Sequence, residues 1–253
     1  MDNKYSVLKS VAVSLWTVSD KFTDFIKTAG VFALFLTVLS YIFGQTYVCV
    51  FMPEKNISLP CLGNSLIYFP YLIVKLLVIN FFIIFWFKKI LWNQSINKTL
   101  AARSSGMFFL FVIFNLMPLV SAVLLLIRKA NPVWQIELLY FTIVSIGFLL
   151  PFVLMRFYAV FAGVLENSTT DLLKKVWVNT GGYSAKIIIS AIIVYSIALL
   201  TVISVNSVIF RFGNALPLQM YNLIAEYVFN FMALFSVALI ADFIDYQKQV
   251  FLK

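Results

Sequence analysis

Residues 71–80 read YLIVKLLVIN, a run of hydrocarbon side chains interrupted by one ammonium group, that of Lys75. The whole chain shares this character, since 62% of its 253 residues are hydrophobic and only 11% are charged. A soluble domain has about 45–50% apolar and about 25% charged residues. The composition therefore predicts an all-α polytopic membrane protein, with 1–253 forming a single integral membrane domain.

Six apolar runs are each long enough to cross a bilayer core of about 30 Å as a helix. We predict spans at about 28–51, 66–87, 107–127, 137–160, 185–210 and 221–241. The inner end of the fourth span is not fixed by the pattern and falls between Met155 and Leu165. Pro70, Pro118 and Pro151 lie inside these spans, where proline kinks or locally breaks a helix.

The basic residues are divided unequally between the two sides of the predicted membrane. Fourteen of the nineteen Lys and Arg residues fall on one side, four on the other, and Lys75 lies within a span. The positive-inside rule then places both termini in the cytoplasm, for a multi-pass protein of the inner (plasma) membrane. Because the basic residues are dispersed between spans, we expect the bilayer, and no nucleic acid, as the partner.

The first 27 residues precede the first predicted span and carry a helical repeat of apolar side chains. The repeat consists of Tyr5, Leu8, Val11, Leu15, Val18, Phe22 and Phe25. Spacings of three and four predict an amphipathic helix, which we place in the cytoplasmic interface. The alternative is a helix that packs on the inner loops of the bundle itself.

Two further segments on the inner side have helical patterns. A short helix is predicted from Thr169 to Asn179, with Gly181 and Gly182 as its C-terminal stop. The tail, 242–253, is a third candidate for an interfacial helix. Such helices could contact a membrane-protein partner or a second copy of the chain, although most helices that flank spans are structural.

Three glycines recur at a spacing of 76 residues: Gly30, Gly106 and Gly182. Each follows a pair of small residues and precedes a predicted outward span, so the pattern is consistent with three helical hairpins in a parallel repeat. Small residues and glycine permit a sharp turn into the bilayer and close helix approach. The alternative is that turns favour glycine without any duplication.

Polar side chains inside the predicted spans form the candidate intramembrane polar cluster. Lys75 and Glu226 both fall in the outer half, and Asn230 shares a helical face with Glu226. A charge at mid-bilayer costs about 2.5–3.5 kcal/mol on insertion scales unless it is paired or hydrated. We therefore hypothesise that Lys75 faces the interior and pairs with Glu226; the alternative is that it snorkels outward.

Two deeper polar residues extend this candidate cluster. If the fourth span continues to Leu165, Arg156 lies in the inner half of the membrane, and the 76-residue spacing matches it to Asn80. Together with Asn230, these side chains could line a polar interior or bind a lipid phosphate. The alternative is an arginine that marks the cytoplasmic end of its span.

Cysteine and histidine usage limits the chemistry. Cys49 and Cys61 bracket the first predicted outer loop, where they either form a disulfide or remain two thiols. Histidine is absent, and we find no phosphate-binding glycine loop, nucleophile elbow or metal-ligand motif. We therefore expect no catalytic residues, no metal, no cofactor and no enzymatic activity.

The stretch 149–188 resembles the YciC-like (UPF0259) membrane proteins and related bacterial six-helix families. The matching features are Pro151, Arg156, Glu166, Trp177 and the Gly181-Gly182 pair. The resemblance implies an inner-membrane protein without an established activity. We expect an assembly, regulatory or envelope-maintenance role. The alternative is a transporter or permease subunit that uses a polar interior around Lys75, Glu226 and Arg156.

Overall fold

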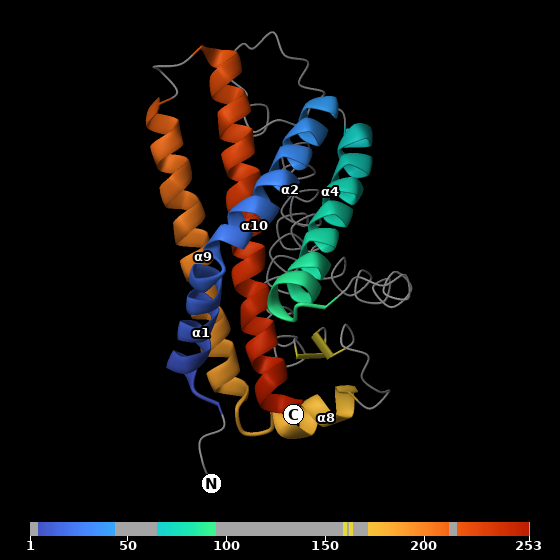
Figure 1. Cartoon of the computed structure of the whole chain (residues 1–253), viewed down its shortest axis with the longest axis vertical. Helices are drawn as coiled ribbons and strands as arrows, with labels where there is room; N and C mark the ends of the chain where they lie inside the picture. The colour runs from blue at the N-terminus through green and yellow to red at the C-terminus, as the bar shows by residue number, and fades with distance from the viewer. Residues whose placement is uncertain are drawn as a thin grey trace, which may run out of the picture. The chain divides into compact units, whose positions relative to one another are not determined.

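The computed structural model describes residues 5–43, 65–94, 159–160, 162–163, 172–212 and 217–252. All elements in this part are helical, and no strand occurs in it, which confirms the predicted all-α class (Figure 1). The elements are α1 (Val7–Asp20), α2 (Phe22–Ile42), α4 (Ser65–Phe85), the π-helix η1 (Trp86–Leu91), α8 (Leu172–Asn179), α9 (Ser184–Phe212) and α10 (Leu218–Phe251). The third predicted span and nearly all of the fourth lie outside the described residues.

Three helices in the described part are long and apolar enough to cross a membrane: Phe22–Ile42, Ser184–Ile209 and Gln219–Phe251. They correspond to the first, fifth and sixth predicted spans. Helix α4 takes the position of the second predicted span but is not one of these three. These three helices are compatible with a membrane protein, and the count of six spans stays a prediction.

The boundary between the first two helices differs from the prediction. Helix α1 ends at Asp20 and α2 already begins at Phe22, not at Thr28. Backbone hydrogen bonds continue through this junction, since Lys21 N–H donates to the carbonyl of Thr17 and Phe25 N–H donates to that of Lys21. The predicted interfacial segment 1–27 therefore contains the whole of α1 and the first six residues of α2.

Gly30 consequently lies inside α2 and not at a turn. A Cβ at this position would lie 3.3 Å from the hydroxyl of Tyr227 on α10, so the missing side chain leaves room for the Tyr227 side chain. Gly182 has φ +82° and lies in the turn between α8 and α9. One of these glycines is inside a helix and the other is in a turn, so the described residues give no support to a repeat. Gly106 lies outside the described residues.

The C-terminal helices also depart from prediction. Helix α8 ends at Asn179, as expected, and the Gly181-Gly182 turn follows it. The tail is not a separate helix, because α10 continues without interruption to Phe251. Neither glycine nor proline occurs between Ala241 and Phe251, so nothing in the sequence breaks the helix there.

The chain divides into two compact units, which are described separately. One comprises Met1–Val7, Asn97–Ala191 and Ile244–Lys253, and the other Leu8–Ile96 and Ile192–Phe243. In the first, Tyr5 stacks on Phe251 with ring centroids 5.3 Å apart. In the same unit α8 caps the end of α10, since Asn179 Nδ2 donates to the Phe251 carbonyl at 2.6 Å and Lys175 Nζ to that of Leu252 at 2.8 Å.

In the second unit, α2 lies beside α4 (blue and teal in Figure 1). Its core is an aromatic cluster around Phe25, whose ring meets those of Trp86, Phe231 and Phe235 edge to face at 5.2–5.7 Å. Phe82 stacks on Trp86 at 6.1 Å. Aromatic pairs of this kind contribute about 0.5–1.5 kcal/mol each beyond area burial.

Beside this aromatic core, parts of the helices in this unit bury small or polar residues and expose large apolar ones. On α1, Ser10 and Ser14 are completely buried, whereas Leu8 is 81% and Trp16 73% exposed. The apolar face predicted for this segment is therefore split, because Leu8 and Leu15 point outward while Val18 is buried. The buried hydroxyl of Ser14 donates a hydrogen bond within its own helix, since Oγ lies 2.8 Å from the Ser10 carbonyl.

The same arrangement recurs on α2, where Ala29, Ala33 and Thr37 are buried and Leu34 and Phe35 are exposed. Small residues at helix contacts are typical of membrane proteins, because lipid competes with large apolar side chains for contact and close backbone approach supplies the packing energy. In water this exterior would be strongly unfavourable.

Replacement of Gly182 by alanine is expected to lower the free energy of unfolding by about 1 kcal/mol, because a Cβ is disfavoured at positive φ. No heavy atom lies within 4 Å of the position that the Cβ would take, so the backbone alone determines the effect. Gly182→Asn is the matched control, since asparagine tolerates this conformation and should cost less. Equal losses for both variants, measured by SDS titration in mild detergent, would contradict the explanation.

Candidate functional site: an intramembrane polar network

Helix α10 carries three polar residues at intervals of four: Asn222, Glu226 and Asn230. All three are buried, with Asn222 and Asn230 completely inaccessible and Glu226 only 2% exposed. The four-residue interval places them on one face of the helix, one turn apart. Glu226 and Asn230 belong to the candidate cluster predicted from the sequence, and Asn222 does not.

Asn230 joins this stripe to α2. Its Nδ2 donates to Glu226 Oε1 at 3.0 Å and to Thr37 Oγ1 at 3.3 Å. Thr37 in turn donates to the Ala33 carbonyl at 2.8 Å. This hydrogen bond joins Glu226 and Asn230, which the sequence places on one helical face, and Thr37 is an additional member from a second helix.

A second set of contacts joins α2 to α4. Ser40 Oγ and Tyr71 Oη lie 2.9 Å apart, and Lys75 Nζ donates to the same Tyr71 oxygen at 3.2 Å. Ser40 is one turn beyond Thr37 on the same face of α2. We call the six residues of both sets the polar network: Thr37, Ser40, Tyr71, Lys75, Glu226 and Asn230.

Lys75 is half-buried and lies among aromatic rings. Its Nζ is 5.5 Å from the ring centroid of Tyr71 and 5.6 Å from that of Phe229, which is on α10. Cation–π contacts of this kind contribute from about 0.5 to 2 kcal/mol, most where water is excluded. Among the described contacts of Lys75 none is with Glu226, so their ion pair stays a prediction.

The remaining predicted site residues lie elsewhere. Asn80 is buried on α4, five residues beyond Lys75, and no described hydrogen bond joins it to the polar network. Arg156, Cys49 and Cys61 lie outside the described residues, so their predicted roles are untested.

The network residues that sequence analysis missed were Thr37, Ser40 and Tyr71. Two signals pointed to them: Thr37 and Ser40 are polar and three apart within an apolar span, and Tyr71 precedes Lys75 by one helical turn. Neither signal reveals the partner helix. Hydroxyls in a span commonly bond only to their own helix, so spacing alone does not identify a network.

Another interhelical hydrogen bond lies outside this network, toward the other end of α4 and α10. Trp86 Nε1 donates to Asp242 Oδ1 at 2.8 Å, and both residues are buried. At the same end of α4, Lys21 Nζ donates to the Ile90 carbonyl, and Lys88 Nζ to Gln94 Oε1 at 3.0 Å. The bonds of Trp86 and Ile90 join the π-helix η1 to α10 and to the residue that precedes α2, whereas the Lys88–Gln94 bond is local.

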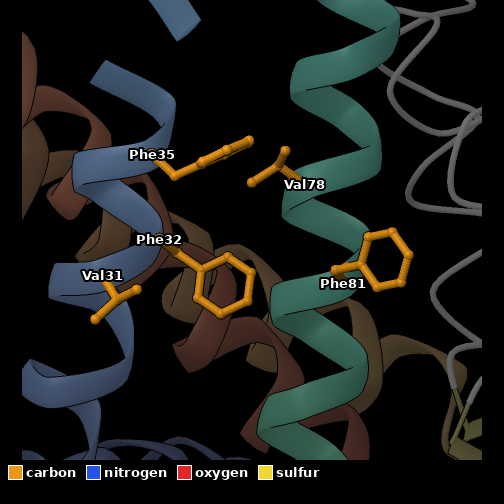
Figure 2. Close-up of a pocket in the computed structure, with 5 residues that line it drawn as sticks. All are labelled: Val31, Phe32, Phe35, Val78 and Phe81. Atoms are coloured by element: carbon orange, nitrogen blue, oxygen red, sulfur yellow. The ribbon is translucent and has the colours of Figure 1, made fainter. Parts of the chain in front are cut away.

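An apolar groove of about 350 Å³ lies between α2 and α4. It is lined by Val31, Phe32, Phe35, Val78 and Phe81. Figure 2 shows Phe32 and Phe35 projecting from α2 toward α4, and Phe81 directed away from α2. No polar side chain lines this groove, so it offers hydrocarbon contact and no group for chemistry.

Within the described part of the chain, no group of three or more His, Cys, Asp or Glu residues could hold a metal ion. Comparisons with protein-family models, curated proteins and solved structures give no match for this chain. The arrangement of the site is therefore the basis for a functional proposal.

Proposed function

We propose that this is a six-span protein of the inner (plasma) membrane, with both termini in the cytoplasm and a non-catalytic role in assembly, regulation or envelope maintenance. The observation that carries the proposal is the number of large apolar side chains on the exterior of the helices. Serine, alanine and threonine face the helix contacts, and Leu8, Trp16, Leu34 and Phe35 face outward. Contact of these side chains with lipid is favourable, whereas their exposure to water would be unfavourable.

The polar contacts support a structural role for the network. Each set of hydrogen bonds joins two helices, and interhelical hydrogen bonds in membranes contribute about 0.6 kcal/mol on average. The polar side chains are directed at one another, and the groove of about 350 Å³ is apolar. The proposal also agrees with the resemblance to the YciC-like membrane proteins.

Transport is the second candidate, and buried Glu226 is the observation that favours it. Ionisable residues inside spans often mark ion or proton pathways. The two functions differ in one property of the network, which is access to water. A transporter must hydrate Glu226 in some state, whereas a structural contact can stay dry.

Cysteine accessibility in native membranes tests both proposals. With Cys49 and Cys61 replaced by serine, single cysteines are placed at Thr37 in the network and at exposed Leu34 on the same helix. We expect a water-soluble maleimide to modify neither, and a lipid-soluble maleimide to modify the cysteine at 34. Lys174→Cys is the topology control, and it should react with the water-soluble reagent only after permeabilisation.

Each other outcome has a defined meaning. Reaction of the cysteine at 34 with the water-soluble reagent would exclude a lipid-facing surface and overturn the membrane proposal. Reaction at 37 but not at 34 would contradict the structural role and favour transport. Reaction of the cysteine at 174 in intact cells would place this segment outside and reverse the topology.

A further inference from the structure

The apolar groove between α2 and α4 is open to the exterior of these helices. Three of its lining residues, Val31, Phe35 and Phe81, are exposed. Its volume of about 350 Å³ is within the usual range for small-molecule sites, about 300–1,000 Å³. In the membrane protein proposed above, the hydrocarbon that fills such a groove is an acyl chain. The groups at the ends of the groove then determine which lipid fits best.

Two lysines lie beyond one end of this groove. Lys27 precedes Val31 by one turn on α2, which corresponds to about 6 Å along the helix axis. Lys89 is on η1, which continues α4. From Phe81 onward the positions that are not buried recur every four residues, through Phe85 to Lys89, and the residues between them are buried. Each lysine therefore continues the outward face that lines the groove on its own side.

Contacts between the two segments show that the lysines are at the same level. Phe32 meets Phe85 with ring centroids 6.4 Å apart, and Lys21 Nζ donates to the Ile90 carbonyl. The segments run in opposite directions, so both lysines fall between these two contacts. Two positive charges thus lie beyond the same end of an apolar groove, in the order in which a phospholipid carries its phosphate and its acyl chain.

The ammonium groups of Lys27 and Lys89 are accessible to a ligand. Both side chains are exposed, and neither has a hydrogen bond or an ion pair within the described part of the chain. The neighbouring lysines differ, since Lys21 donates to a backbone carbonyl and Lys88 to Gln94. The exposed pair therefore has the hydrogen-bond donors that a phosphate accepts.

Charge favours an anionic lipid over a zwitterionic one. Basic residues next to a span attract the anionic lipids of the cytoplasmic leaflet, and the proposed topology places this end of α2 at that leaflet. A zwitterionic headgroup carries an ammonium of its own, which the lysines repel. Asp24 precedes Lys27 by three residues and is further from the groove, so the charge next to the groove is positive.

We propose that α2 and α4 bind an anionic phospholipid, with an acyl chain in the apolar groove and the phosphate between Lys27 and Lys89. This inference rests on the proposed membrane location and topology, and it goes beyond them because it assigns a ligand to the groove. The groove supplies hydrocarbon contact for the chain, and the two lysines supply the preference for negative charge.

Binding of labelled dioleoyl phosphatidylglycerol to the purified, delipidated full-length protein in mild detergent tests the site. The wild type is expected to bind it saturably and about tenfold or more tighter than dioleoyl phosphatidylcholine, which has the same chains and no net charge. Lys27→Gln and Lys89→Gln should each weaken phosphatidylglycerol binding about fivefold and leave phosphatidylcholine binding unchanged. Lys174→Gln is the matched control, since it removes an exposed lysine from α8 and should bind as the wild type does.

Phe81→Ala separates the groove from the headgroup contacts. This variant removes an exposed wall of the groove and no charge, so the affinities for both lipids should fall by the same factor. Leu34→Ala is its control, because Leu34 is exposed but does not line the groove. Glycerol 3-phosphate has the phosphate without a chain and should not displace phosphatidylglycerol. Displacement would indicate a site for the headgroup alone and would overturn the role of the groove.

Equal affinity of the wild type for the two lipids would overturn the proposal, as would unchanged binding by Lys27→Gln and Lys89→Gln. Gel filtration checks that the variants are folded, and their substituted side chains are all exposed. Failure of this inference is distinct from failure of the proposed function. The maleimide assay in native membranes tests the membrane location independently of any lipid preference.

Discussion

Replacement of Phe25 by alanine is expected to lower the free energy of unfolding by about 3 kcal/mol or more, which is the largest effect of any single truncation that we predict. Phe25 is completely buried, and three aromatic rings from η1 and α10 surround it. Truncation of a buried phenylalanine typically costs about 3–5 kcal/mol. In lipid most of this loss comes from packing contacts, because the bilayer solvates apolar groups as well as the core does.

Phe35→Ala provides the matched control on the same helix. Phe35 is 54% exposed and lies at the apolar groove, so its removal should change stability by less than about 1 kcal/mol. SDS titration of both purified variants in mild detergent measures the difference. Similar losses for Phe25→Ala and Phe35→Ala would mean that the cluster around Phe25 is not the core of this unit.

Trp86→Phe is expected to lower the free energy of unfolding by about 1.5–3 kcal/mol. The substitution keeps an aromatic ring beside Phe25 and Phe82 but removes the N–H that donates to Asp242 at 2.8 Å. Hydrogen bonds to charged groups contribute about this amount, and Asp242 is buried, so water does not replace the donor. The smaller ring also leaves a cavity, which adds to the loss.

A double-mutant cycle separates the hydrogen bond from the cavity. In an Asp242→Asn background the acceptor is neutral, so Trp86→Phe should cost less than in the wild type. Trp16→Phe is the control for the substitution itself, since Trp16 is exposed. An identical cost of Trp86→Phe in both backgrounds would show that the bond to Asp242 contributes nothing.

The polar network was predictable in part. Glu226 and Asn230 are four residues apart in an apolar run, so their contact follows from helical geometry alone. The partner of Lys75 could not be predicted from the sequence. A lysine side chain is long enough to reach several positions, so its contacts depend on which helix packs beside it. The sequence suggested Glu226, and that ion pair stays a prediction; the structure adds Tyr71 and Phe229 beside the ammonium.

The contact between Trp86 and Asp242 had no signal in the sequence. The two residues are 156 positions apart, and neither spacing nor composition relates them. Gly30 was misplaced for a similar reason. A glycine after two small residues fits both a turn and a close helix contact, and only the position of Tyr227 distinguishes the two.

The sequence by itself determined that this chain is helical and apolar enough for a bilayer, and it located the helices now seen as α2, α9 and α10. Hydropathy and 3.6-residue periodicity are local properties, so they are readable without knowledge of the fold. Only the tertiary structure decided which face of each helix is buried. In lipid both faces are apolar, and the choice depends on how small residues and hydrogen-bonding groups of distant helices fit together.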